Sequence, residues 1–251
     1  TDQRVAGTAL YAFVHIEKTA GRTVRAVLLR SFGAGHCEIR TPYSRREPEF
    51  EDRRVHVTGA DLHRVRRIYR HLRGIAGHNV KPYSDLHTAC PDVRYFIFLR
   101  DPVQRYLSHY KNKALQYDRA DFDRWASLAP MQDFQTRTLA GEANAQRAID
   151  LIGSRVGFVG LTDAFDESLL MLGRWLGDPD FRPEYRPVNR LADKSRARDT
   201  AREQADLSYL DDPAVRAPRT GNRHRCPDTS TVTDVLIQNC HRCLETSHRR
   251  T

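Results

Sequence analysis

A chain of 251 residues can bury a full hydrophobic core, and we expect it to form one catalytic-size domain with insertions. Its 39% hydrophobic and 29% charged residues are ordinary for a globular protein, and without an apolar run of about 18 residues we expect no membrane span in this chain. The net charge of +9 favours an anionic partner such as a nucleotide, a nucleic acid or a polyanionic glycan, and the alternative is a GC-rich genome that encodes arginine wherever a solvated cation is tolerated.

The first clear pattern in the chain is a short apolar run followed by a helical period. Residues 9–16 are apolar and aromatic, and they predict a buried strand. After a glycine-containing turn, residues 23–33 predict a helix that ends at Gly33. Residues 41–54 are charged and contain prolines, so we expect an exposed loop there.

The next part of the chain carries weaker signals. Residues 53–59 predict a second short strand, and the arginine-rich residues 60–73 are a helix candidate. Residues 74–80 predict another short strand, which carries His78.

Two strong strand–turn–helix units follow. Residues 93–100 form a nearly continuous apolar run, as in a strand covered on both faces, and Pro102 suits the first position of a helix. Residues 155–177 repeat the pattern, with Thr162 or Asp163 as the expected helix cap. Three such units predict a three-layer α/β domain whose central sheet is mostly parallel and flanked by helices.

The end of the chain has a different character. Residues 190–210 are a polar helix candidate, whereas residues 211–251 have few apolar residues and no period. We therefore expect a domain over residues 1–210 and a poorly structured C-terminal tail over 211–251. Cysteines and histidines in the tail are zinc-ligand types, but their spacing matches no known zinc finger, and we expect no metal.

The cysteine pattern and the first residues of the chain indicate in which cellular compartment the protein is expected. An odd number of widely spaced cysteines does not predict a disulfide framework and favours a reducing compartment. These are Cys37, Cys90, Cys226, Cys240 and Cys243. The sequence begins at Thr1 without a signal pattern, and a removed upstream anchor would leave no trace.

The turn after the first strand, "HIEKTAGRT", gathers groups suited to an anion. In parallel α/β sheets, ligands bind at the carboxyl ends of strands, where helix N-termini present free N–H groups. Nucleotide triphosphatases use Gly-x-x-x-x-Gly-Lys-[Ser/Thr], whereas here Lys18 precedes Gly21, which disfavours a common kinase or GTPase. A helix start capped by a threonine beside a solvated lysine is the structural alternative.

This turn resembles the 5′-phosphosulfate loop of sulfotransferases that use 3′-phosphoadenosine 5′-phosphosulfate (PAPS). The similarity is to their glycan-modifying branch, typified by the heparan sulfate 2-O- and 6-O-sulfotransferases. Residues 95–112, "YFIFLRDPVQRYLSHYKN", resemble the 3′-phosphate segment of that family, with Arg100 and Ser108 at its binding positions. The stretches "GHNV", "FQTRTLAG" and "FVGLTDAFDESLLML" resemble further family blocks in the same order, so the similarity covers about residues 10–189.

The resemblance implies a P-loop-like fold and an enzyme that moves the sulfuryl group from PAPS to a hydroxyl acceptor, for which we expect a carbohydrate. The product would be 3′,5′-adenosine diphosphate, and no metal is required. Lys18 would stabilise the leaving phosphate, and His78 would be the base, with Glu17 as the second candidate. The donor would be bound by Lys18, Thr19, Ala20, Gly21, Arg22, Thr23, Arg100, Ser108 and Thr162. The acceptor would be bound by His78, Gln135 and Arg137.

Alternatives to these roles remain open. At Arg22 the sequence departs from the family, which has a small or hydroxyl residue at that position. The simpler interpretation of His78 is a histidine packed at the end of a strand, and we expect His15 to be a packed histidine too. Capping a helix is the simpler role of Thr162.

Two rival functions belong to other classes. The first is an atypical nucleotide-dependent kinase. The second is a basic nucleic-acid-binding protein, whose best support is the stretch "HRVRRIYRHLR" over residues 63–73, although we expect no nucleic-acid partner. The expected location is the cytoplasm, as a soluble enzyme of bacterial type, and the alternative is a lumenal catalytic domain whose anchor has been removed.

Overall fold

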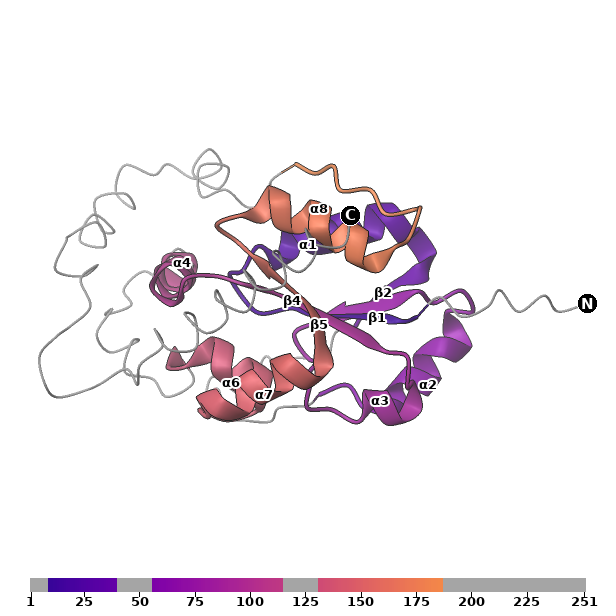
Figure 1. The fold of residues 1–251 in the computed structure, drawn as a ribbon, viewed down its shortest axis with the longest axis horizontal. Coiled ribbons are helices and arrows are strands. Elements are labelled where there is room, and N and C mark those ends of the chain that lie inside the picture. The colour runs from indigo at the N-terminus through magenta and orange to yellow at the C-terminus, as the bar shows by residue number, and fades with distance from the viewer. Residues whose placement is uncertain (1–8, 40–55, 115–130, 187–251) are drawn as a thin grey trace, which may run out of the picture. The chain divides into compact units, whose positions relative to one another are not determined.

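The structure is a computed structural model, and it describes residues 9–39, 56–114 and 131–186 (Figure 1). The chain divides into two compact units. The first comprises residues 1–99 and 135–185, and the second comprises residues 100–134 and 186–251. The predicted loop at 41–54, helix at 190–210 and tail at 211–251 lie outside the described residues, so the domain boundary at residue 210 stays a prediction.

A sheet of five parallel strands forms the centre of the first unit, in the order β2-β3-β1-β4-β5. The strands are β1 (Tyr11–Val14), β2 (His36–Glu38), β3 (Gly74–Gly77), β4 (Arg94–Leu99) and β5 (Val156–Leu161). Every residue of β1 and β3 is buried, because these inner strands are covered on both faces.

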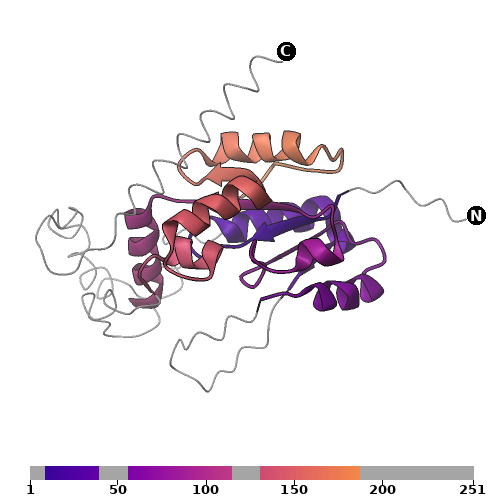
Figure 2. The ribbon, with the colours of Figure 1, turned by 60° about the horizontal axis from the view of Figure 1, so that its bottom comes forward.

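Helices cover both faces of this sheet (Figures 1 and 2). One face carries α1 (Gly21–Phe32) and α8 (Phe165–Leu176). The other carries α2 (Gly59–Ile68), α3 (Leu86–Ala89), α6 (Phe134–Ala140) and α7 (Ala145–Arg155). The short 3-10 helix η1 (Gly33–Gly35) follows α1. The expected three-layer, P-loop-like α/β architecture with a parallel sheet is thus confirmed.

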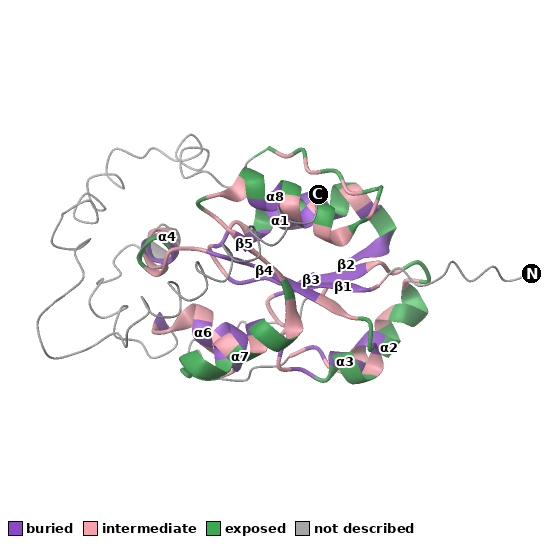
Figure 3. Ribbon diagram, viewed as in Figure 1, coloured by how far each residue is buried: buried purple, intermediate pink, exposed green. Residues whose placement is uncertain are grey.

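Aromatic packing fills the layer between the sheet and the α1/α8 pair. Phe13 of β1 stacks on Phe96 of β4 at 4.8 Å between ring centroids, and Trp175 of α8 meets Phe96 edge-on at 6.1 Å. Figure 3 shows the outcome, with buried residues along β1, β3 and β4 and exposed residues on the outer sides of the helices. The second unit contributes α4 (Pro102–Ala114) to the described residues.

The chain beyond α8 also packs on this layer. Phe181 and Tyr185 join the aromatic cluster, and the Arg182 N–H donates to Ser31 Oγ at 2.8 Å. Arg73 forms ion pairs with Asp178 at 2.5 Å and with Asp180 at 2.6 Å. Residues 178–185 are therefore part of the first unit's packed structure rather than a loose extension.

Several local predictions are confirmed. The four predicted strand regions 9–16, 74–80, 93–100 and the start of 155–177 each contain a strand. Gly33 ends α1 with a φ of 50°, a conformation that glycine adopts without strain, and Pro102 is the first residue of α4.

Two local predictions are wrong. Residues 56–58 of the expected strand at 53–59 are not a strand, because Val57 donates to Asn79 O at 2.9 Å outside the sheet and Gly59 already begins α2. Neither Thr162 nor Asp163 caps α8, whose N-cap is Ala164. Instead the Thr162 hydroxyl donates to Leu99 O at 2.8 Å, which joins the ends of β5 and β4. Among the described residues, no helix has both the length and the apolar character needed to cross a bilayer.

Candidate active site

The loop after β1 lies where the strand connections change direction. From β1 the chain passes over β3 to edge strand β2, whereas from β4 it continues to β5 on the opposite side. In open parallel sheets, ligands bind at the carboxyl ends of the strands at such a switch point. The loop of residues 15–20, which we name the anion loop, leaves β1 at this place and leads into α1.

The backbone of the anion loop is sharply turned. Lys18 and Ala20 have positive φ values of 68° and 59°, which only a tight turn imposes on residues other than glycine. Thr19 is fully buried, and its hydroxyl donates to Ile16 O at 3.0 Å, so that it closes the turn. The Thr23 N–H donates to Ala20 O at 2.9 Å, which starts α1.

The start of α1 has the properties of an anion site. Its N-cap, Ala20, has no side chain that could accept a hydrogen bond, and the first turn contains no acidic residue. The helix dipole and the N-terminal N–H groups therefore face no negative side chain of the helix itself. Lys18 and the exposed Arg22 add positive charge on either side, so these residues fit a phosphate or sulfate group.

Gly21 is required by its neighbour His15. A Cβ atom built on Gly21 would lie 2.0 Å from Cδ2 and 2.1 Å from Nε2 of His15, because the imidazole ring occupies that space. His15 is 4% exposed, so the ring has little room to give way. The packing of His15 thus explains why a glycine stands at this position of the predicted motif.

The pairing of β1 with β3 brings His78 to the anion loop. Val14 is in register with Gly77, so the next residues, His15 and His78, lie side by side. Their rings stack at 4.0 Å between centroids with an interplanar angle of 25°. His78 Nδ1 lies 2.8 Å from the His15 carbonyl oxygen, which can only accept, so Nδ1 carries the proton in the neutral ring. Nε2 therefore holds the lone pair that a general base needs.

Burial keeps His78 neutral. The pKa of His78 is lowered from its ordinary value, first by burial and also by the positive charges of Lys81 and Arg25. The Glu17 carboxylate and the bond to His15 O act in the opposite direction. The net effect leaves His78 unprotonated near neutral pH, which is the state that accepts a proton.

The buried histidines predict a loss of stability in acid. Burial lowers the pKa of His15 to about 2 and that of His36, on β2, to about 4, against 6.5 for both in an unfolded chain. Below pH 6.5 the unfolded chain binds more protons, so the free energy of unfolding falls as the pH falls. Each such histidine costs about 1.4 kcal/mol per pH unit, until the pH reaches its folded-state pKa.

Denaturant unfolding between about pH 7.5 and 5 measures this loss. The change is expected to be smaller in His15→Phe, which lacks one of the titrating groups. A free energy of unfolding that stays constant over this range in the unaltered protein would contradict the neutral, buried state of these rings.

The remaining predicted donor residues lie apart in the sequence. Arg100 directly follows β4, and Ser108 lies on α4, both in the second unit and both half-buried. Asp101 caps α4, because its carboxylate accepts from the Gln104 N–H at 2.8 Å. Binding of the donor by Arg100, Ser108 and Thr162 stays a prediction.

The predicted acceptor residues lie on one short helix. Gln135 and Arg137 are half-buried residues of α6, and the buried Thr136 lies between them. Their contact with an acceptor stays a prediction.

Two arginines were missed by the motifs. Arg25, one turn into α1, forms an ion pair with Glu38 of β2, and its charge lowers the pKa of His15, His36 and His78. In the second unit, Arg105 of α4 is 2% exposed, with its guanidinium 4.4 Å above the Phe134 ring. The sequence signal for Arg25 is its spacing of one helical turn from Gly21, which puts it near the start of the predicted helix.

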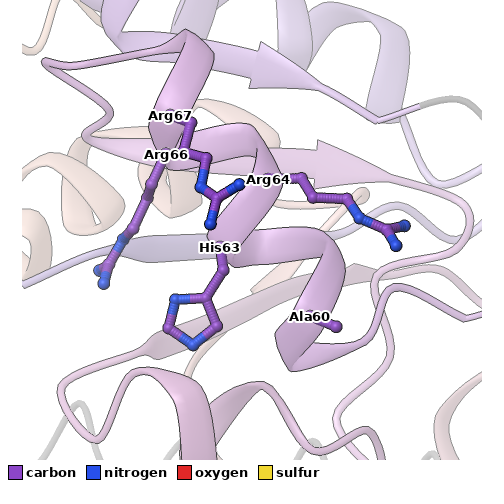
Figure 4. A pocket seen from close by; sticks show the side chains of 5 residues that line it. All are labelled: Ala60, His63, Arg64, Arg66 and Arg67. Carbon is purple, nitrogen blue, oxygen red and sulfur yellow. The ribbon is translucent and has the colours of Figure 1, made fainter.

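An open hollow of about 600 Å³ lies along α2 and involves none of the predicted site residues (Figure 4). Its lining residues are Ala60, His63, Arg64, Arg66 and Arg67. The predicted basic helix is thus present in its first part only, because α2 ends at Ile68, and its exposed arginines are the feature that a nucleic-acid-binding protein would share. Within the described ranges, no group of three or more metal-ligand side chains comes together.

Comparison with known proteins identifies relatives at the level of a family. The model of a family described as "Sulfotransferase family" matches residues 2–164. A crystal structure of a sulfotransferase from Alicyclobacillus acidocaldarius is similar at 17% identity, with a TM-score of 0.41, over 82% of this chain and 96% of that one. No protein with a curated description matches significantly.

Proposed function

Because the chain belongs to the sulfotransferase family, we propose that it transfers the sulfuryl group of PAPS to a hydroxyl group of a carbohydrate. The matched residues, 2–164, include the anion loop, His78, Arg100 and Ser108. Sulfuryl transfer is common to the family, whereas the donor and the acceptor are proposals that we argue from the residues.

The observation that carries this proposal is the neutral His78 beside the anion loop. PAPS supplies an activated sulfuryl group bonded to its 5′-phosphate. His78 has its Nδ1 proton bonded to His15 O, so Nε2 is free to remove the proton of an acceptor hydroxyl. Lys18 and the α1 N-terminus provide positive potential for the phosphate that leaves with the bridging oxygen. Sulfuryl transfer, like phosphoryl transfer, then depends mainly on positioning and charge.

The carbohydrate acceptor rests on the resemblance to the glycan-modifying branch. A cytoplasmic location remains our expectation, with a lumenal catalytic domain as the alternative. Acceptor specificity is expected in the segments 36–54 and 112–130. Their described residues belong mainly to β2 and to the end of α4, and the rest lie outside the described residues.

Binding of 3′,5′-adenosine diphosphate tests the donor. We expect this compound to raise the melting temperature more than ATP or AMP, with a gain of about 2.7 kcal/mol at a concentration of 100 times its Kd. Arg100→Ala should lose most of the selectivity, because the 3′-phosphate would lose its bidentate partner. Lys18→Ala should retain the preference for the 3′-phosphate, because Lys18 is expected at the other phosphate.

Arg174→Ala serves as the matched control, since it removes the charge of an exposed arginine on α8. An equal shift with ATP, or none with the 3′,5′ compound, would overturn the proposed donor and favour the kinase or nucleic-acid alternatives. Scanning calorimetry or dye-based melting measures the shift.

A further inference from the structure

His15 fills the space between the start of α1 and His78. Its ring stacks on His78 at 4.0 Å and on Phe13 at 5.6 Å between centroids, and it occupies the place of a Cβ atom at Gly21. With 4% of the residue exposed, the ring can move only if one of these neighbours moves. The His15 side chain therefore connects the start of α1 with the His78 ring through direct van der Waals contacts.

The contact on the side of α1 is with the backbone. Gly21 is the first residue of α1, and it touches the imidazole without an intervening side chain. A displacement of the helix start by a few tenths of an ångström would press on, or release, the His15 ring directly. Under the proposed function, the donor phosphate binds at this helix start.

The contact on the side of β3 fixes the base. The His15 N–H donates to Gly77 O at 3.2 Å, its carbonyl oxygen accepts from His78 Nδ1 at 2.8 Å, and its ring covers the His78 ring. The backbone of residue 15 thus sets which nitrogen of His78 carries the proton, and the side chain sets the tilt of the His78 ring.

The His15 ring itself is a neutral spacer. Burial, then the neighbouring His78 and Arg25, lower its pKa to about 2, so it stays uncharged when His78 takes up a proton. Within the part of the chain that the structure describes, His15 Nδ1 has no hydrogen-bond partner. Van der Waals contacts, rather than a hydrogen bond, therefore fix the ring on the Nδ1 side. A ring fixed by such contacts moves when the groups packed against it move.

We propose that His15 is a positioning residue that transmits occupancy of the α1 N-terminus to the ring of His78, so that the base is aligned when the donor is bound. This inference rests on the proposed function, in which His78 is the base and α1 holds the donor phosphate. It assigns His15 no contact with either substrate.

Histidine NMR of the whole protein tests this coupling. With 15N- and 13C-labelled histidine at about pH 8, where His15, His36 and His78 are all neutral, we follow the ring signals of His78 while adding 3′,5′-adenosine diphosphate. The high pH matters because a bound anion also raises the pKa of a nearby histidine, and that charge effect needs no contact through His15. His36, buried on β2 and bonded to Tyr11 Oη at 2.9 Å, is the internal reference.

In the unaltered protein, the His78 and His15 ring signals should shift together while the His36 signals stay in place. In His15→Ala the His78 shift should largely disappear, although the nucleotide still binds, and kcat should fall by roughly 2- to 30-fold at an unchanged Kd for the nucleotide. His15→Phe, which keeps a flat ring on His78, should restore most of the response.

The outcomes separate the two proposals. A nucleotide that stabilises the protein without moving the His78 signals, or that moves them equally in His15→Ala, overturns the coupling and leaves the donor assignment intact. A nucleotide that gives no thermal stabilisation overturns the proposed donor, and the coupling with it. If His15→Ala does not fold, the unaltered protein decides, because His15 and His78 signals that do not shift together when the nucleotide binds overturn the coupling.

Discussion

His78→Asn is expected to lower kcat by two to four orders of magnitude while the Kd for 3′,5′-adenosine diphosphate changes little. The asparagine amide can take the place of Nδ1 and donate to His15 O, so the local fold is kept. What the variant loses is the lone pair at the position of Nε2. Single-turnover measurement of sulfuryl transfer, with nucleotide binding measured separately, distinguishes this loss from a loss of affinity.

Glu17→Gln is the control for this experiment, because Glu17 is the other candidate base. Since the Glu17 carboxylate raises the pKa of His78, its removal should lower that pKa further and move the acid limb of the kcat/KM profile to lower pH. The activity at neutral pH should then stay within about an order of magnitude. A large loss in Glu17→Gln together with a small loss in His78→Asn would assign the base to Glu17 instead.

The second large effect is expected at Lys18. Replacement of Lys18 with asparagine removes the positive charge, but asparagine tolerates the positive φ of 68° at this position better than most residues. The variant therefore measures the loss of the Lys18 charge without adding backbone strain to the turn. Because one preorganised donor to a developing negative charge typically contributes about a hundredfold, kcat should fall by about that factor.

Arg22→Gln is the matched comparison, since Arg22 is a neighbouring cation that is exposed on the first turn of α1. It should change kcat by a few-fold at most, and its effect should weaken in salt, as expected for a solvent-screened charge. Equal losses in the two variants would show that general positive potential, rather than Lys18 itself, supports the leaving group.

Much of the fold was predictable where burial leaves a strong pattern. β4 is covered on both faces, and its apolar run was recognised with an error of one residue at either end. β2 was missed because it is a three-residue strand, "HCE", whose length and polarity resemble a loop. The strand predicted at 53–59 has suitable residue types, but its described residues 56–58 are not a strand, because the Thr58–Asp61 capping box starts α2 there.

The candidate site was predictable in its contiguous part only. The anion loop and the first turn of α1 are one stretch of sequence, so Lys18, Thr19, Gly21 and Thr23 could be recognised together. The stack of His15 on His78 joins residues 63 positions apart and depends on the register of β1 and β3. A single sequence does not encode that register in a readable form, and His15 was accordingly interpreted as a packed residue alone.

Residues 178–185, which pack on α1 and on the aromatic layer after α8, bear on the size of the folding unit. The residues that match the family model end at residue 164, before α8 begins. A chain cut there would lose Leu169 and Leu172, both 1% exposed or less, and would uncover Phe96 and Phe98. A stretch that keeps this aromatic layer covered must therefore extend beyond the matched residues, to about residue 185.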